Sequence, residues 1–113
     1  AALNNLAWTL GELKDPAASG YAEKAYAKAP ANPSVLDTYG WLLLDGGDVK
    51  RGVALLTQAA NALPKSPEVR MHLAKALLKS GDKASAKREL EAVVQLPDAG
   101  ALKAEAERLL QSF

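Results

Sequence analysis

Few side chains in this chain of 113 residues are arranged to do chemistry. His72 is the only histidine and cysteine is absent, so this imidazole could form a metal site only together with carboxylates. It lies between the apolar Val69 and Leu73 in a stretch with helical spacing. We therefore expect a structural histidine, partly buried or at the surface, and no metal site.

The patterns that most often carry catalysis or phosphate binding are missing. No Gly-x-Ser-x-Gly nucleophile motif occurs, and Gly46-Gly47 does not lead into the Gly-Lys-Ser or Gly-Lys-Thr of a phosphate-binding loop. Glu89 and Glu91 are two residues apart, and on a helix such residues point to different sides. We expect no enzyme activity and no cofactor.

The charge balance argues against nucleic acid and membranes as partners. Fourteen Lys and Arg residues against thirteen Asp and Glu residues give a net charge of +1. The basic cluster of Lys83, Lys87 and Arg88 has glutamates beside it and no interleaved aromatic residues. No apolar stretch approaches the roughly 20 residues that span a bilayer. We expect a protein or peptide partner, no nucleic acid, and no direct membrane insertion.

The elements that must position these side chains repeat along the sequence. The residues that follow Pro33 align without a gap on those that follow Pro67, a spacing of 34 residues, and both blocks reach a Gly-Asp pair at the same offset. Upstream the spacing is 33 residues, where Trp8 aligns with Trp41. A recurrence of this length is typical of stacked helical repeats.

Each repeat contains two segments with apolar residues three and four apart, which predicts a pair of helices. Gly47 and Gly81 can end the first helix in the left-handed conformation, and the aspartate that follows each of them can cap the second helix. Prolines delimit most of the remaining ends. We expect seven helices, near residues 1–13, 16–29, 34–46, 49–62, 67–80, 83–96 and 99–112.

This unit resembles the tetratricopeptide repeat, which has about 34 residues and helix-turn-helix form. The resemblance covers nearly all of the chain and is carried by Leu36, Tyr39, Gly40, Leu43, Leu56, Ala59 and Pro64. It implies an all-α fold, a right-handed α–α superhelix that makes a single domain of residues 1–113. The resemblance further implies three helix hairpins and a C-terminal capping helix, at about 1–32, 33–66, 67–98 and 99–112.

Some features depart from the repeat pattern or lie outside it. Gly52 stands where a small alanine is expected, Arg70 where a large apolar residue usually lies, and Pro97 arrives one residue early. We expect these residues to change local packing and not the fold.

Helical spacing begins at the first residues, without an initiator methionine or a signal-peptide pattern. We expect a fragment of a longer protein, with further repeats on its N-terminal side.

Residues 3–8 and 37–42 also resemble the C-terminal repeats of large bacterial tetratricopeptide proteins associated with exopolysaccharide and PEP-CTERM sorting systems. This narrower resemblance implies a protein of the cell envelope or periplasm that scaffolds secretion or polymer export. Composition leaves the compartment unknown, because a chain without cysteine fits a reducing cytosol and an envelope equally well.

In this family, partners usually bind the concave groove that is formed by the first helix of each repeat. Carried onto this chain, the resemblance implies partner-binding positions at Asn4, Trp8, Glu12, Asp37, Trp41, Leu44, Asp45, Met71, Lys75 and Lys79. The acidic residues lie at the tryptophan end and the lysines at the other end, so an extended ligand would bind in one orientation, with a basic residue near the tryptophans. The basic residues that grip a C-terminal carboxylate in some members are absent.

Two interpretations of the tryptophans remain open. Large apolar residues at helical spacing more often belong to the core than to a site. Leu3, Leu6 and Leu10 already supply a core stripe on the first helix, however, which would leave the indoles for the groove. We therefore expect a protein- or peptide-binding scaffold module. The alternative is a passive spacer or capping end of a longer solenoid that has no ligand of its own.

Overall fold

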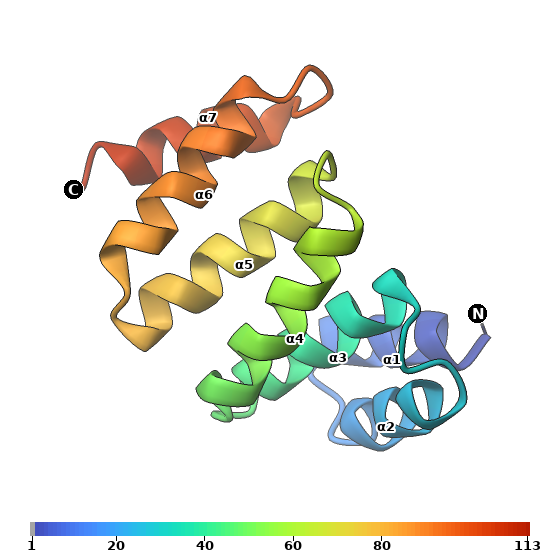
Figure 1. Cartoon of the computed structure of the whole chain (residues 1–113). Helices are drawn as coiled ribbons and strands as arrows, with labels where there is room; N and C mark the ends of the chain where they lie inside the picture. The colour runs from blue at the N-terminus through green and yellow to red at the C-terminus, as the bar shows by residue number, and fades with distance from the viewer. Residues whose placement is uncertain (1) are drawn as a thin grey trace.

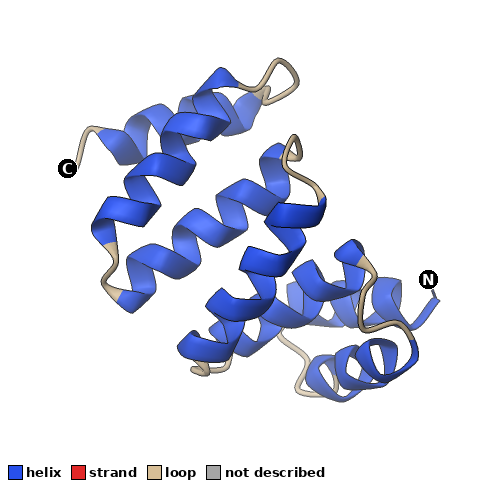
Figure 2. Ribbon diagram, viewed as in Figure 1, coloured by secondary structure: helices blue, strands red, loops and turns tan. Residues whose placement is uncertain are grey.

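The computed structural model describes residues 2–113 and contains seven α-helices and no strand within them (Figure 1). Figure 2 shows that only short loops separate the helices. Every helix begins and ends within two residues of the range expected from the sequence, so the all-α class is confirmed. The bounds are α1 Ala2–Glu12, α2 Ala18–Lys28, α3 Pro33–Asp45, α4 Val49–Ala62, α5 Pro67–Ser80, α6 Lys83–Gln95 and α7 Ala101–Leu110.

The helices stack in chain order as a helical-repeat solenoid. Each helix packs on the next one, and further contacts join α1 to α3, α3 to α5 and α5 to α7. The first helices of the hairpins therefore form one row, and α7 continues this row beyond α5. In Figure 1 the stack runs from the blue N-terminal hairpin to the red α7, and the two ends of the chain lie far apart.

Local hydrogen bonds determine where the second helices begin. Asp48 and Asp82 each accept a hydrogen bond from the amide three residues later, which caps α4 and α6. Before α2, Asp15 instead accepts from the amide of Ala17 at 2.9 Å. This bond closes a turn of its own, so α2 begins at Ala18, two residues beyond the expected start.

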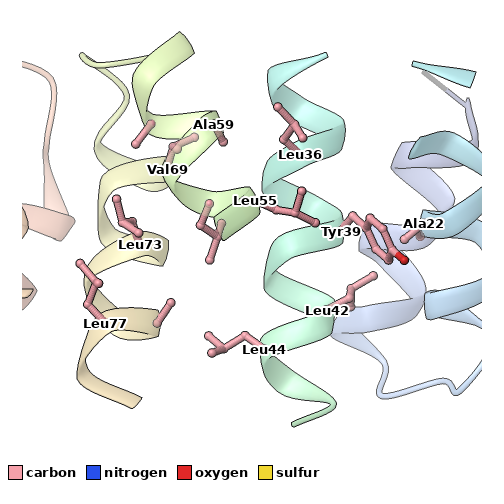
Figure 3. Packing of buried hydrophobic residues seen from close by; sticks show 14 of the residues in the cluster. Ala22, Leu36, Tyr39, Leu42, Leu44, Leu55, Ala59, Val69, Leu73 and Leu77 are labelled. Atoms are coloured by element: carbon pink, nitrogen blue, oxygen red, sulfur yellow. The ribbon is translucent and has the colours of Figure 1, made fainter. Parts of the chain in front are cut away.

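Two clusters of buried apolar side chains form the core. In the first, Leu36 and Tyr39 of α3, Leu55 of α4 and Leu73 of α5 lie between their helices (Figure 3). The second joins α5 and α6 to the loop and helix that follow, and consists of Met71, Ala74, Leu90, Val93, Ala99 and Ala106. The helix α7 therefore covers the apolar side of the third hairpin, with Ala106 fully buried.

Gly52 brings α4 into contact with α3. A Cβ atom at Gly52 would lie 2.9 Å from the carbonyl oxygen of Gly40 and 3.1 Å from the Cβ atom of Leu44. A Cβ atom at Gly40 would lie 3.0 Å from Cγ of Leu56. Because this crossing has no room for a methyl group, glycine replaces the alanine that the repeat pattern expects at position 52.

Arg70 makes polar contacts at a position where the repeat pattern expects apolar packing. Its Nη1 atom lies 2.8 Å from Oε1 of Glu89, and its Nε atom donates a hydrogen bond of 2.6 Å to the carbonyl oxygen of Pro64. The guanidinium therefore joins α5 both to α6 and to the turn before α5. These contacts account for a charged residue at a half-buried place.

Three residues are not where the sequence placed them. Leu44 and Met71, expected to line the groove, are only 3% and 1% exposed, so the prediction was wrong for both. Leu44 lies one turn after Gly40 on the face that packs on α4, and Met71 packs with Leu90 in the second cluster. Leu6, expected in the core stripe of the first helix, is 40% exposed.

Candidate functional site

Three aromatic rings from three successive first helices meet on one face of the stack. His72 of α5 lies against both tryptophans, with its ring centroid 4.7 Å from that of Trp41 on α3 and 5.5 Å from that of Trp8 on α1. The planes of His72 and Trp41 are inclined by only 29°, which is a stacked arrangement. We call Trp8, Trp41 and His72 the aromatic cluster.

A hydrogen bond to Asp37 fixes the imidazole. The Nδ1 atom of His72 lies 2.8 Å from Oδ1 of Asp37, and the two side chains are only 17% and 16% exposed. Asp37 stands one helical turn before Trp41 on α3, so the same helix that supplies one indole also orients the ring stacked on it. Because a carboxylate oxygen can only accept, Nδ1 of His72 is the donor in this hydrogen bond.

From the sequence, Asp37 was expected in the groove and His72 was expected to be structural. The repeat register aligns His72 with Thr38, which is buried, and therefore does not mark it as a groove residue. Its importance depends on a contact between residues 35 positions apart. The one signal in the sequence was that the only histidine follows Asp37, an acidic residue expected in the groove, by about one repeat.

A hollow of about 230 Å³ opens beside the aromatic cluster, between the C-terminal ends of α1 and α3. We call it the α1–α3 hollow, and its lining residues are Trp8, Gly11, Glu12, Lys14, Trp41, Leu42 and Asp45. Glycine is required at its base, because a Cβ atom at Gly11 would lie 2.6 Å from Cδ2 of Leu42. At its mouth, Nζ of Lys14 lies 3.5 Å from Oδ2 of Asp45.

A second hollow, of about 320 Å³, begins on the other side of Trp8. Its walls include Asp37 and His72 together with Ser66 and Glu68 from the start of the third hairpin. Trp8 lines both hollows. An extended ligand that crosses the indole of Trp8 would therefore contact α1, α3 and α5 in turn.

The structure brings some of the expected groove residues to this place and separates others from it. Trp8, Glu12, Trp41 and Asp45 line one hollow, whereas Lys79 lines a different one beside Val49 of α4. Lys79 therefore lies outside the lining of the hollow that the tryptophans share.

Asn4 and Lys75 lie near the ends of the row of first helices. Asn4 stands one turn before Trp8 and is half-buried, and its Oδ1 atom has no hydrogen-bond donor among residues 2–113. Lys75 is paired at 2.9 Å with Glu105 of α7. With Lys75 paired to Glu105 and Asp37 to His72, the charges of the α1–α3 hollow come from Glu12, Asp45 and Lys14.

Trp41 also belongs to the interior. It packs against the first core cluster, is half-buried, and also lines the hollow. The expectation that both indoles are surplus to the core is therefore wrong for Trp41. Its side chain both lines the hollow and packs on the core.

The His72–Asp37 pair has the contact of a catalytic dyad but not its surroundings. Within residues 2–113, no hydroxyl forms a hydrogen bond with Nε2 of His72, and no three His, Cys, Asp or Glu side chains are gathered as metal ligands. Ser66, one of the hydroxyl residues that line the second hollow, accepts from the amide of Val69 and donates to Glu68. The geometry of this face is suited to binding: flat rings, carboxylates and two open hollows.

Comparison with known proteins adds one finding. A family model described as tetratricopeptide repeat matches residues 43–105, from the last turn of α3 into α7, which is more than half of the chain. No curated protein sequence matches the chain. Among the described residues, no helix is both long enough and apolar enough to cross a membrane.

Proposed function

Since the chain belongs to the tetratricopeptide repeat family, whose repeats generally mediate protein–protein interactions, we propose that it is a peptide-binding scaffold module whose ligand lies across the aromatic cluster. The observation that carries the proposal is the meeting of Trp8, Trp41 and His72 between two hollows. Partly buried aromatic side chains beside a concavity are typical anchors of binding energy.

The composition of the chain supplies a reporter for this site. Both tryptophans of the protein belong to the aromatic cluster, so its entire indole fluorescence arises there. A ligand that covers the cluster should change the emission of the whole protein without any added label. This makes a screen of unknown peptides practical.

The test is a peptide-display selection on the immobilised chain, followed by fluorescence titration of the selected peptides. Trp8→Ala should weaken binding at least about thirtyfold, the loss of about 2 kcal/mol that is typical of an aromatic anchor. Trp8 is the better choice for truncation because Trp41 also packs on the core. Phe113→Ala, which removes an exposed aromatic ring at the other end of the stack, is the matched control.

A different outcome would favour the second candidate, a passive spacer within a longer solenoid. That candidate is favoured by the packing of Trp41 on the core and by the exposure of Leu6. If no selected peptide binds the wild type more tightly than the Trp8→Ala variant, the aromatic cluster is a structural contact and the binding proposal fails.

We further propose that another helical repeat packs against the outer side of α1. The exposed Leu6 supports this, because apolar side chains on a repeat surface are usually covered by the next repeat. A copy of residues 33–66 fused before residue 1 should raise the melting temperature, and Leu6→Glu should cancel the increase. An unchanged melting temperature of the fusion would argue against such packing.

The resemblance of residues 3–8 and 37–42 supports a narrower proposal for the biological setting. Both segments lie on the first helices and include the two tryptophans. We propose a role in bacterial envelope secretion or exopolysaccharide assembly. Cell fractionation of the source organism tests this, since recovery only in the cytosol would exclude it.

A further inference from the structure

Resting on the proposed function, we infer that the α1–α3 hollow receives a basic side chain, arginine or lysine, of the peptide ligand, and that Lys14 covers the hollow in the free protein. The inference specifies the chemistry of the ligand at one place. It also gives a function to a lysine that the repeat pattern does not explain.

The walls of the hollow suit a cation with a flat or slender shape. Trp8 and Trp41 present indole rings, and the faces of such rings attract a guanidinium or an ammonium. Glu12 and Asp45 contribute carboxylates from the ends of α1 and α3. A guanidinium can stack on an indole and bond a carboxylate at the same time, which matches this combination of walls.

The carboxylates are not already neutralised within the fold. Glu12 has no ion pair among residues 2–113, and it is exposed at the end of its helix. Among the described residues Asp45 is paired only with Lys14, at 3.5 Å, and the lysine side chain is 77% exposed. The carboxylates of Glu12 and Asp45 are therefore available to a ligand, whereas the carboxylate of Asp37 is held by His72.

Lys14 is an intramolecular stand-in for the ligand. It lines the hollow, and its ammonium reaches one of the two carboxylates. The chain itself thus shows that a lysine side chain fits at the mouth. Because the pair is exposed and its atoms are far apart for a hydrogen bond, an incoming basic side chain can displace it at small cost.

The backbone at Lys14 strengthens this argument. Its φ angle is +59°, in the left-handed region that disfavours residues with a side chain, and it follows the end of α1. The equivalent places after α3 and α5 are occupied by Gly47 and Gly81, with φ angles of +100° and +88°. Stability alone favours glycine here, so the strained lysine supports a role for its ammonium at the hollow.

The test uses two small probes, N-acetyl-arginine amide and N-acetyl-lysine amide, with N-acetyl-citrulline amide as the neutral control of equal length. The protein has only two indole N–H groups, and NMR spectra can follow both. The basic probes should shift the resonances of Trp8 and Trp41 in a saturable manner, and citrulline should not. Equal shifts with citrulline, or no shift in the wild type and in Lys14→Gln, would overturn the inference.

Variants separate the roles of the charges. Glu12→Gln and Asp45→Asn should each weaken binding of the arginine probe about two- to fivefold, the range expected for one exposed ion pair. Lys14→Gln should strengthen it by about the same factor, because the competing ammonium is gone. Lys87→Gln, a charge change at an exposed position of α6, is the matched control and should have no effect. Weaker binding by Lys14→Gln would refute the covering role of Lys14.

Lys14→Gly distinguishes charge from backbone strain. This variant should bind the arginine probe as tightly as Lys14→Gln does, and it should also melt at a higher temperature, because glycine adopts the left-handed conformation without strain. A lower melting temperature would mean that the Lys14–Asp45 contact stabilises the fold instead of covering a site.

The peptides selected for the proposed function keep the two proposals distinguishable. If their binding depends on Trp8 but survives replacement of every basic residue by a neutral one, the cation site is refuted while the peptide-binding function stands. If the arginine probe binds but no peptide depends on Trp8, the hollow is a cation site and the peptide-binding function fails.

Discussion

The imidazole of His72 stacks on the indole of Trp41, with 4.7 Å between the ring centroids and 29° between the planes. The two residues belong to different repeats, and Asp37 holds the imidazole from the same helix that carries Trp41. This contact joins the second hairpin to the third at the face where we propose that the ligand lies. The first prediction tests it.

His72→Ala should lower the free energy of unfolding by about 1–3 kcal/mol, because it leaves the largely buried carboxylate of Asp37 without its partner. It should also red-shift the indole emission, since both tryptophans lose a neighbouring ring. Urea denaturation followed by fluorescence measures both effects. His72→Phe keeps the ring but not the hydrogen bond, so it should restore the emission and not the stability. An unchanged spectrum in His72→Ala would mean that the stacking is not maintained in solution.

Gly52→Ala should destabilise the protein by about 1–3 kcal/mol, the usual cost of overpacking a tight contact. The new methyl group would meet the carbonyl oxygen of Gly40 at 2.9 Å and the side chain of Leu44. Gly20→Ala is the matched control, because a Cβ atom at Gly20 has no neighbour within 4 Å. On helix propensity alone, this control should gain up to about 1 kcal/mol. Thermal unfolding compares the two variants, and equal shifts would show that α3 and α4 are not in close contact.

Deletion of residues 102–113 should destabilise the third hairpin by several kcal/mol. It uncovers Met71, Leu90 and Val93, and the loss of a few buried leucine-sized side chains costs about 2–5 kcal/mol each. The deletion also removes Glu105, the partner of Lys75. Lower thermal stability and binding of a hydrophobic dye are the expected results.

A point variant separates the loss of packing by α7 from the effect of shortening the chain. Ala106→Asp keeps the length of the chain but places a charge at a fully buried position, so it should reproduce the loss of stability. Lys103→Ala, at an exposed position of the same helix, should not. If neither the deletion nor Ala106→Asp changes the melting temperature, α7 does not cap the stack.

Asp82 should contribute to a loss of stability in acid. The hydrogen bond from the amide of Ser85 to its carboxylate, at 3.1 Å, lowers the pKa of Asp82 below the usual 3.8. A group with a lower pKa in the folded state stabilises the fold above its unfolded pKa, and this contribution disappears as the pH falls through the folded pKa. The dependence should therefore appear below about pH 4.

Urea denaturation at neutral pH and in acid measures this contribution. Asp82→Asn still offers an acceptor for the cap but cannot be protonated, so the stability of this variant should fall less steeply in acid than that of the wild type. Asp98→Asn, in the loop before α7, is the control for removal of one exposed carboxylate. Parallel acid profiles for Asp82→Asn and the wild type would contradict the prediction.

The sequence determined most of what depends on neighbours along the chain. Helix ends follow from short-range chemistry: Asp48 and Asp82 cap the amides three residues ahead, and Gly47 and Gly81 adopt the left-handed conformation that ends a helix. The 33-residue spacing of Trp8 and Trp41 also predicted that they share a face, because a repeat structure gives equivalent positions equivalent surroundings.

Only the tertiary structure decided which side chains meet. Leu44 and Met71 lie within one turn of groove positions, but both side chains are buried in the core. The burial of Leu44 depends on the close crossing of α3 and α4, which the glycines at positions 40 and 52 allow but which helical periodicity alone does not specify. The contact of His72 with Asp37 likewise depends on how α5 packs against α3, because the two residues belong to different repeats.

Lys14 shows in a single residue both what the sequence determined and what only the tertiary structure decided. Its position after the first helix, beside Asp15, could be read from the sequence, but neither its left-handed backbone nor its contact with Asp45 could. The local rule predicts glycine where φ is positive, and here the residue is a lysine. Residues 14 and 45 come together only because α1 packs against α3. Side-chain contacts between helices depend on their relative placement in three dimensions, and the pattern of residues along one helix does not contain that information.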